Sequence, residues 1–98
     1  MIEINESNFS AETSTGVVIV DFYAPWCGPC RALAPVLEQI TGAKVVKVNT
    51  DSNQSLAVEH SVSAIPKLLF MKDGKVVDQM TGVASKEAIQ SKVNALNN

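Results

Sequence analysis

Long hydrophobic runs are missing from this sequence. The apolar run from Val17 to Val20 is ended by Asp21, whereas a helix that crosses a membrane needs about 20 apolar residues. The first residues, MIEINES, also lack the basic and apolar regions of a secretion signal. We therefore expect no membrane partner and a cytoplasmic location.

Basic clusters are missing as well. Eight lysine and arginine residues are scattered singly among ten acidic ones, and the formal net charge is -2. Proteins that bind nucleic acid usually present a basic patch that displaces counterions from the phosphates. We therefore expect no nucleic-acid partner.

Metal-ligating residues are few. A structural zinc site uses four ligands of the Cys or His type, and this chain has only Cys27, Cys30 and His60. A metal site is therefore a weak interpretation of the two cysteines, and we expect no metal and no bound cofactor. His60 lies in a short polar segment, where we expect an ordinary surface side chain without a catalytic role.

The composition is that of a folded domain. Hydrophobic residues make up 46% of the 98 residues and charged ones 18%, unlike a disordered segment. A chain of this length can bury a core without a disulfide or a metal to hold it. We expect a single domain over residues 1–98 that folds alone as a monomer.

Hydrophobic periodicity predicts alternating strands and helices. Val17 to Tyr23 is rich in β-branched and aromatic residues, as is a strand covered on both faces. From about Cys27 to Ile40 the apolar residues recur at helical spacing, and Pro35 should bend this helix. The other expected strands are 2–4, 44–49, 67–72 and 75–81, and the other helices are a short one that buries Phe9, one through Glu59 that Asp51 to Ser55 cap, and a last one after Ser85.

Turn and cap residues mark where some of these elements begin and end. Asp73-Gly74 suits a tight hairpin with positive φ between two antiparallel strands. Ser85 can cap the final helix. The order βαβαβαββα predicts an α/β sandwich with a mixed sheet.

Cys27 and Cys30 are spaced for a disulfide, because residues i and i+3 of a helix have Cα atoms about 5 Å apart. So small a loop constrains the unfolded chain little, so a structural staple is a weak reason for the bond. A reversible redox pair is the favoured interpretation, ahead of metal binding and of a pair of thiols without function.

The position of Cys27 favours a thiolate. It lies where a strand ends and a helix begins, at the positive end of the helix dipole. If Cys27 is the N-cap, the Cys30 amide is the expected donor to its sulfur, because Pro29 has no amide hydrogen. We expect Cys27 to attack and the more shielded Cys30 to resolve.

Segments along nearly the whole chain resemble the thioredoxin family. They are VDFYAPWCGPCRALAP, VVKVNTD, AIPKLLFMKDGK and the segment around Gly82. The resemblance implies the thioredoxin fold, a three-layer α/β/α sandwich with about five strands and four helices. It implies a protein disulfide reductase whose partners are disulfide-containing clients and a thioredoxin reductase, with NADPH acting only through that reductase.

The resemblance also assigns residues around the pair. A buried Asp at the position of Asp21 helps to move the proton of the second cysteine in the family, and Lys47 matches its nearby lysine. Without the resemblance, the simplest interpretation of Asp21 is a solvated charge at a strand end, and that of Lys47 is a surface side chain. The substrate groove implied by the resemblance is formed by Trp26, Gly28, Pro29, Ile65, Pro66, Gly82 and Val83, with a cis bond before Pro66.

Three departures from the family pattern remain, one of them a connection around Thr41 to Ala43 that is shorter than usual, and two alternative functions stay open. Lys67 stands where thioredoxins usually carry Thr, so partner choice or thiolate stability can differ, and Tyr23 replaces a frequent Trp. One alternative function is a disulfide oxidant or isomerase on the same fold. The other is a binding module or processivity subunit in which the thiols are incidental.

Overall fold

The computed structural model describes residues 1–98. Five strands and four helices follow in the expected order βαβαβαββα. The strands are β1 (Ile2–Ile4), β2 (Val17–Tyr23), β3 (Lys44–Asn49), β4 (Lys67–Lys72) and β5 (Lys75–Thr81). The helices are α1 (Phe9–Glu12), α2 (Gly28–Leu37), α3 (Gln54–Glu59) and α4 (Lys86–Leu96).

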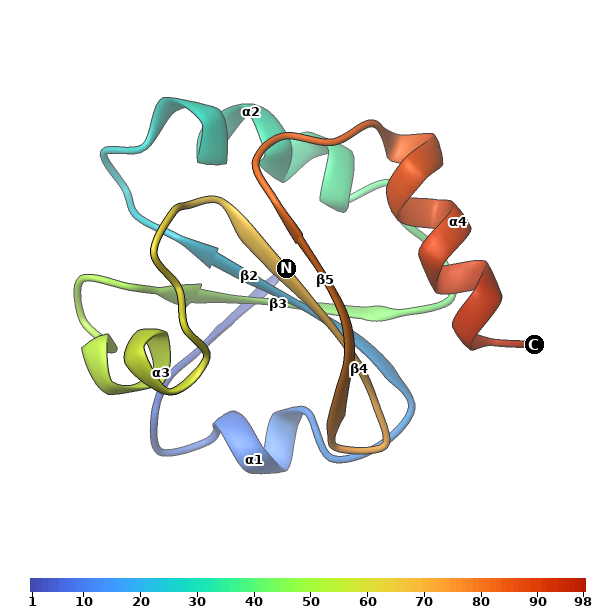
Figure 1. The fold of residues 1–98 in the computed structure, drawn as a ribbon, viewed down its shortest axis with the longest axis horizontal. Helices are drawn as coiled ribbons and strands as arrows, with labels where there is room; N and C mark the ends of the chain where they lie inside the picture. The colour runs from blue at the N-terminus through green and yellow to red at the C-terminus, as the bar shows by residue number, and fades with distance from the viewer.

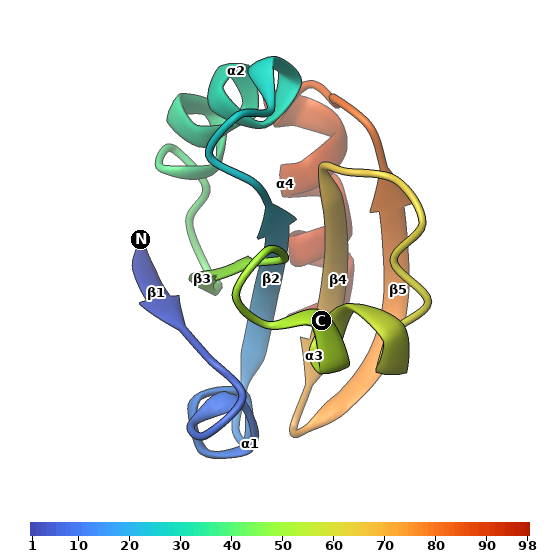
Figure 2. The same cartoon turned by 90° about the vertical axis from the view of Figure 1, so that its left-hand side faces the viewer.

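The strands form one mixed sheet in the order β1-β3-β2-β4-β5. β1, β3 and β2 are parallel to one another, β4 is antiparallel to β2, and β5 is antiparallel to β4. Helices α2 and α4 cover one face of the sheet, and α1 and α3 cover the other (Figure 1). The view turned by 90° shows the sheet between these helices (Figure 2). The expected three-layer α/β/α sandwich, with five strands and four helices, is confirmed.

The central strand β2 supplies side chains to two hydrophobic cores. Val18, Val20 and Phe22 belong to the core on the α1 and α3 side. Ile19 belongs to the core on the α2 and α4 side. Because side chains alternate along a strand, Asp21 shares the face of Ile19 and lies on the α2 side of the sheet.

One helix cap and one turn have the structure that the sequence predicts. The Ser85 hydroxyl accepts a hydrogen bond from the Ala88 amide at 3.1 Å and caps α4. Asp73 and Gly74 join β4 to β5 with φ values of 49° and 84°. The left-handed backbone that a two-residue hairpin needs is therefore present.

Two expected helix ends differ from the structure. α2 ends at Leu37 and not at Ile40, although Ile40 still enters the core below α2 and α4. Asn53 is the N-cap of α3, and no side chain caps this helix. The Asn53 Oδ1 instead accepts from the Glu6 amide at 3.0 Å, so a long-range contact replaces the local cap that the sequence predicts.

The expectation that His60 is a surface side chain is wrong, because its side chain is only 17% exposed. Its ring packs on the rings of Phe9 and Phe22, with centroids 5.1 and 5.8 Å away. The buried Nε2 has no hydrogen-bond partner, and the nearest carboxylate, that of Glu59, lies 3.7 Å away. His60 follows α3 directly, and this short helix turns the ring inward onto the aromatic side chains of the core.

Strand β5 is an edge of the sheet and is largely exposed. Its pairing with β4 slips once: Phe70 is paired with Asp78, but Met71 is paired with Val76. Val77 is therefore the extra residue of a bulge on the edge strand.

Candidate active site

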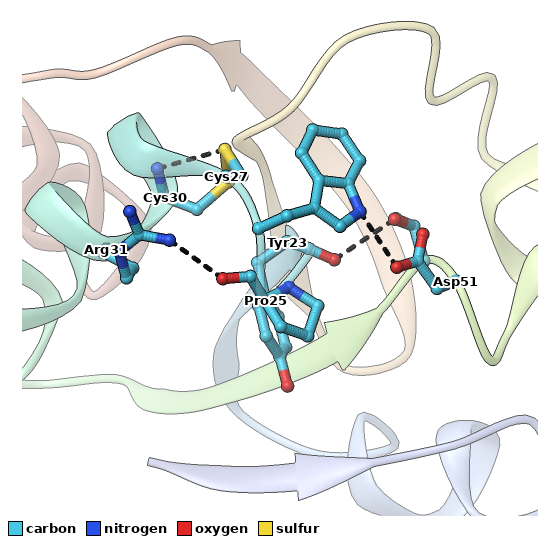
Figure 3. The surroundings of a disulfide bond; sticks show 8 residues. Tyr23, Pro25, Cys27, Cys30, Arg31 and Asp51 are labelled. Atoms are coloured by element: carbon cyan, nitrogen blue, oxygen red, sulfur yellow. Dashed lines mark hydrogen bonds between the residues drawn. A yellow bond between two sulfur atoms is a disulfide. The ribbon is translucent and has the colours of Figure 1, made fainter.

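The cysteines lie where β2 passes into α2. Cys27 is the N-cap of α2 and has extended backbone angles, and Pro29 occupies the first turn. The Cys27 sulfur accepts a hydrogen bond from the Cys30 amide at 3.2 Å, as the sequence predicts (Figure 3). This places the sulfur at the positive end of the helix.

Cys27 and Cys30 form a disulfide, with their Cα atoms 5.3 Å apart. The bond is therefore built within the first turn of the helix, at the separation that the spacing predicts. The exposed fractions of the two residues are 5% and 4%, so the expected difference in shielding is absent. What distinguishes them is their surroundings, because Cys30 lines a cavity that Cys27 does not.

Hydrogen bonds hold the loop that leads into the pair. The Arg31 Nη1 donates to the Pro25 carbonyl at 2.9 Å. The Trp26 indole nitrogen donates to the Asp51 carboxylate at 3.0 Å (Figure 3). Trp26 is nevertheless 69% exposed, so the loop presents a fixed indole to solvent beside the disulfide.

Asp21 is a buried carboxylate beneath the cysteine pair. It is 3% exposed, and its Oδ1 has no hydrogen-bond partner. Asp21 and Cys30 line the same cavity of about 240 Å³. Burial raises the pKa of Asp21 from 3.8 to about 6, because the charged form loses its hydration. This carboxyl group can therefore hold or release a proton near neutral pH.

Lys47 opposes that effect. Lys47 on β3 is the register partner of Asp21 on the neighbouring strand β2, and its side chain lines the same cavity. Its charge lowers the pKa of Asp21, although less than burial raises it. The ammonium nitrogen lies 5.3 Å from the centre of the Tyr23 ring, close enough for a cation–π contact.

The segment before β4 lies against the disulfide. The Ile65–Pro66 peptide bond is cis, and Ile65 packs against the small cluster that Ala24, Cys27 and Cys30 form. The Pro66 carbonyl accepts from the Gly82 amide at 2.8 Å. Val83, next to Gly82, is 59% exposed.

The expected groove residues are thus brought to one end of the sheet. Gly28 and Pro29 are exposed at the start of α2. Ile65 touches the cysteine cluster, and the Gly82 segment is bonded to Pro66. Tyr23 and Ile65 are the apolar side chains packed against the cysteine cluster, and Trp26 and Val83 are exposed apolar side chains of the neighbouring segments.

The contacts of three residues near the site were not predicted from the sequence. Asp51 holds Trp26, and Arg31 holds the Pro25 carbonyl. Lys67 extends away from the sulfurs, and its ammonium group donates to the carbonyls of His60 and Ser61. The contact between Trp26 and Asp51 joins residues 25 positions apart, the other two contacts span six or seven residues, and no sequence pattern marks any of the three.

Neither a cluster of metal ligands nor a helix that could cross a membrane is present. No group of three or more His, Cys, Asp or Glu side chains is placed to hold a metal ion. None of the helices combines the length and the apolar character that crossing a membrane requires.

Comparisons with known proteins agree with this geometry. The family model described as Thioredoxin matches residues 1–95. The chain is 48% identical to a thioredoxin of Bacillus subtilis over 96% of its length and 95% of that protein. It is 43% identical to a thioredoxin of Listeria monocytogenes over 94% of each chain. The structure of a mutant thioredoxin from Halobacterium salinarum matches with a TM-score of 0.92 at 31% identity, covering 99% of this chain and 90% of that one.

Proposed function

The chain belongs to the thioredoxin family of thiol–disulfide oxidoreductases, and from this membership we propose the residue roles in its reduction of protein disulfides. The observation that carries the proposal is the Cys27 sulfur at the N-terminus of α2, bonded to the Cys30 amide. The same amide and the helix dipole stabilise negative charge on this sulfur in the reduced protein. Cys27 is therefore assigned as the attacking thiolate.

The first step is attack of the Cys27 thiolate on one sulfur of a client disulfide. The client's S–S bond breaks, a mixed disulfide forms through Cys27, and the other client sulfur leaves as a thiolate. Apolar surface around the pair supports docking of the client, with Trp26, Gly28, Pro29, Ile65, Pro66, Gly82 and Val83 as the contact residues.

The second step is release of the client by Cys30. Cys30 must lose its proton before it attacks the Cys27 sulfur, and Asp21 is the base assigned to this proton. Three features support the role: the shared cavity, the unpartnered Oδ1 and a pKa of about 6. Lys47 favours the carboxylate form of Asp21 and so keeps the base available. The products are the Cys27–Cys30 disulfide and a reduced client.

The cycle needs an electron donor. We assign recharging to a thioredoxin reductase that draws its electrons from NADPH, as is typical of the family, and disulfide-containing proteins as clients. A dithiol that must return to the reduced state works in a reducing compartment, so the cytoplasm is the proposed location. Residues 1–98 are proposed to act as one domain and as a monomer.

Insulin reduction tests the activity. With NADPH and a thioredoxin reductase, the wild-type protein should reduce insulin, and the double variant Cys27→Ser, Cys30→Ser should not. A double variant that keeps the biological function of the wild type would instead favour a binding module.

Trapping tests the residue roles. Cys30→Ser should accumulate disulfide-linked adducts with client proteins, because the resolving thiol is missing, whereas Cys27→Ser should form none. Turnover of Cys30→Ser without adducts would contradict the assigned roles.

A further inference from the structure

Lys67 is a buried cation without an anionic partner. The residue is 8% exposed, although it begins β4 directly after Pro66. None of the ion pairs in the structure includes it. Buried lysines are rare unless they are paired, so the partners that this ammonium group does have are informative.

Those partners are backbone carbonyls at the end of α3. The Lys67 Nζ donates to the His60 carbonyl at 3.2 Å and to the Ser61 carbonyl at 3.3 Å. The last carbonyls of a helix have no partner inside the helix, and a cation is favoured at this negative end. Ser61, with φ 55°, ends α3 in a left-handed conformation.

The side chain therefore closes the loop that carries Ile65. The chain leaves α3 at His60 and enters β4 at Lys67, and the ammonium group bridges these two ends. Ser63, Ala64 and Ile65 lie between them and make no backbone or side-chain hydrogen bond. On the far side, the Pro66 carbonyl is held by the Gly82 amide. The loop is thus fixed at both ends, while the backbone groups in its middle are free to form hydrogen bonds with a client.

We propose that Lys67 is a positioning residue for client docking, because its ammonium group clasps residues 61–66 in the conformation that presents Ile65 beside the Cys27–Cys30 pair. The inference rests on the proposed function. A loop that is already ordered loses less conformational freedom when a client binds, so the clasp improves docking of extended clients. The ammonium group extends toward α3, so it acts on the loop and not on the sulfurs.

Steady-state insulin reduction with saturating reductase and NADPH tests the proposal. Lys67→Met keeps the apolar stem and removes the donors, and Lys67→Arg keeps both charge and donors. Lys75→Met is the control, because Lys75 is an exposed lysine of the same sheet that makes no ion pair or side-chain hydrogen bond. We expect KM for insulin to rise about fivefold in Lys67→Met with kcat unchanged, as for lost binding that is equal in ground and transition states. Lys67→Arg should return KM to within about twofold of wild type.

Reduction of a small disulfide substrate shows whether a variant has lost client docking or thiol chemistry. Reduction of oxidised glutathione, which is too small to span the loop, should proceed at the wild-type rate in Lys67→Met. An unchanged KM for insulin in Lys67→Met, or an equal loss of activity toward both substrates, would overturn the proposal. If the wild-type protein does not reduce insulin, the proposed function fails; if it does and Lys67→Met behaves like Lys75→Met, only this inference fails.

A measurement on the wild-type protein covers the case in which Lys67→Met does not fold. In NMR spectra of lysine-labelled protein, the Lys67 ammonium protons should exchange with water more slowly than those of Lys75, because they are buried and bonded. Exchange as fast as that of Lys75 would overturn the clasp.

Discussion

Asp21 and Lys47 stand opposite each other on the parallel strands β2 and β3, and both line the cavity that reaches Cys30. Asp21 lies on β2, the strand that leads into α2, and Lys47 lies on β3, the next strand of the sheet. Burial and this cation act on Asp21 in opposite directions. The balance leaves a carboxyl group that titrates near neutral pH, and two predictions depend on it.

The first concerns stability against pH. Because the pKa of Asp21 is raised from 3.8 to about 6, the native protein binds more protons than the unfolded chain within this window. The free energy of unfolding should therefore fall as pH rises from about 4 to about 6 and stay lower above it. Asp21→Asn removes this loss. Relative to wild type, the variant should gain about 3 kcal/mol between pH 3 and pH 7, from about two pKa units at 1.36 kcal/mol each.

Denaturant titrations at the two pH values measure this difference. Asp78→Asn is a control of opposite sign, since the bond from Lys92 lowers the pKa of Asp78, which therefore contributes a small stability at neutral pH. Equal effects of Asp21→Asn at pH 3 and pH 7 would show that Asp21 does not titrate as the structure requires.

The second prediction concerns Lys47→Met. Removing the cation should raise the pKa of Asp21 above about 6, because the charge of Lys47 lowers it. More of Asp21 is then protonated at pH 7, and release of the mixed disulfide by Cys30 should slow. A carbon-13 NMR titration of the Asp21 carboxyl group gives the pKa, and Lys75→Met serves as the charge-matched control. An unchanged or lower pKa would contradict the coupling.

The third prediction concerns the bond between Trp26 and Asp51. Asp51→Ala removes the acceptor of the indole, so the exposed ring should become more mobile, and the anisotropy of its fluorescence should fall. Trp26 is the only tryptophan, which makes the signal specific. KM for insulin should rise about threefold, because a mobile ring must be ordered on docking. Asp51→Asn keeps an acceptor oxygen and should behave like wild type; if it matches Asp51→Ala, the bond is not the cause.

The fourth prediction concerns the cap of α4. Ser85→Ala leaves the Ala88 amide without its acceptor and should lower the free energy of unfolding by about 1 kcal/mol. Ser91→Ala changes an exposed serine within the same helix and should have little effect. Chemical denaturation compares the two variants, and equal losses would argue against a capping role.

Features that depend on a few neighbouring residues were predictable from the sequence. The apolar run of β2, the Asp73-Gly74 turn and the Ser85 cap are local, and each has the expected structure. The bond from the Cys30 amide to the Cys27 sulfur followed from one proline that lacks an amide hydrogen. The redox pair can therefore be predicted from the sequence alone.

Features that join distant segments were not predictable in this way. The inward ring of His60 depends on Phe9 and Phe22, which come from two other elements. The direction of Lys67 depends on where α3 ends. Asn53 bonds to Glu6 and not within its own helix. In each case the partner is set by how the elements pack together in the fold, which hydrophobic periodicity does not describe.

The slipped register at Val77 has a consequence for solubility. A flat, regular edge is a template on which a further chain can add, and this is how sheets grow into aggregates. Val76 and Val77 would be attractive residues for such growth, because both are apolar and exposed. The bulge twists the strand at this point, and the charged Asp78 directly follows it. This edge of the sheet is thus a poor template for strand addition, whereas the exposed indole of Trp26 stands directly before the redox pair in the chain.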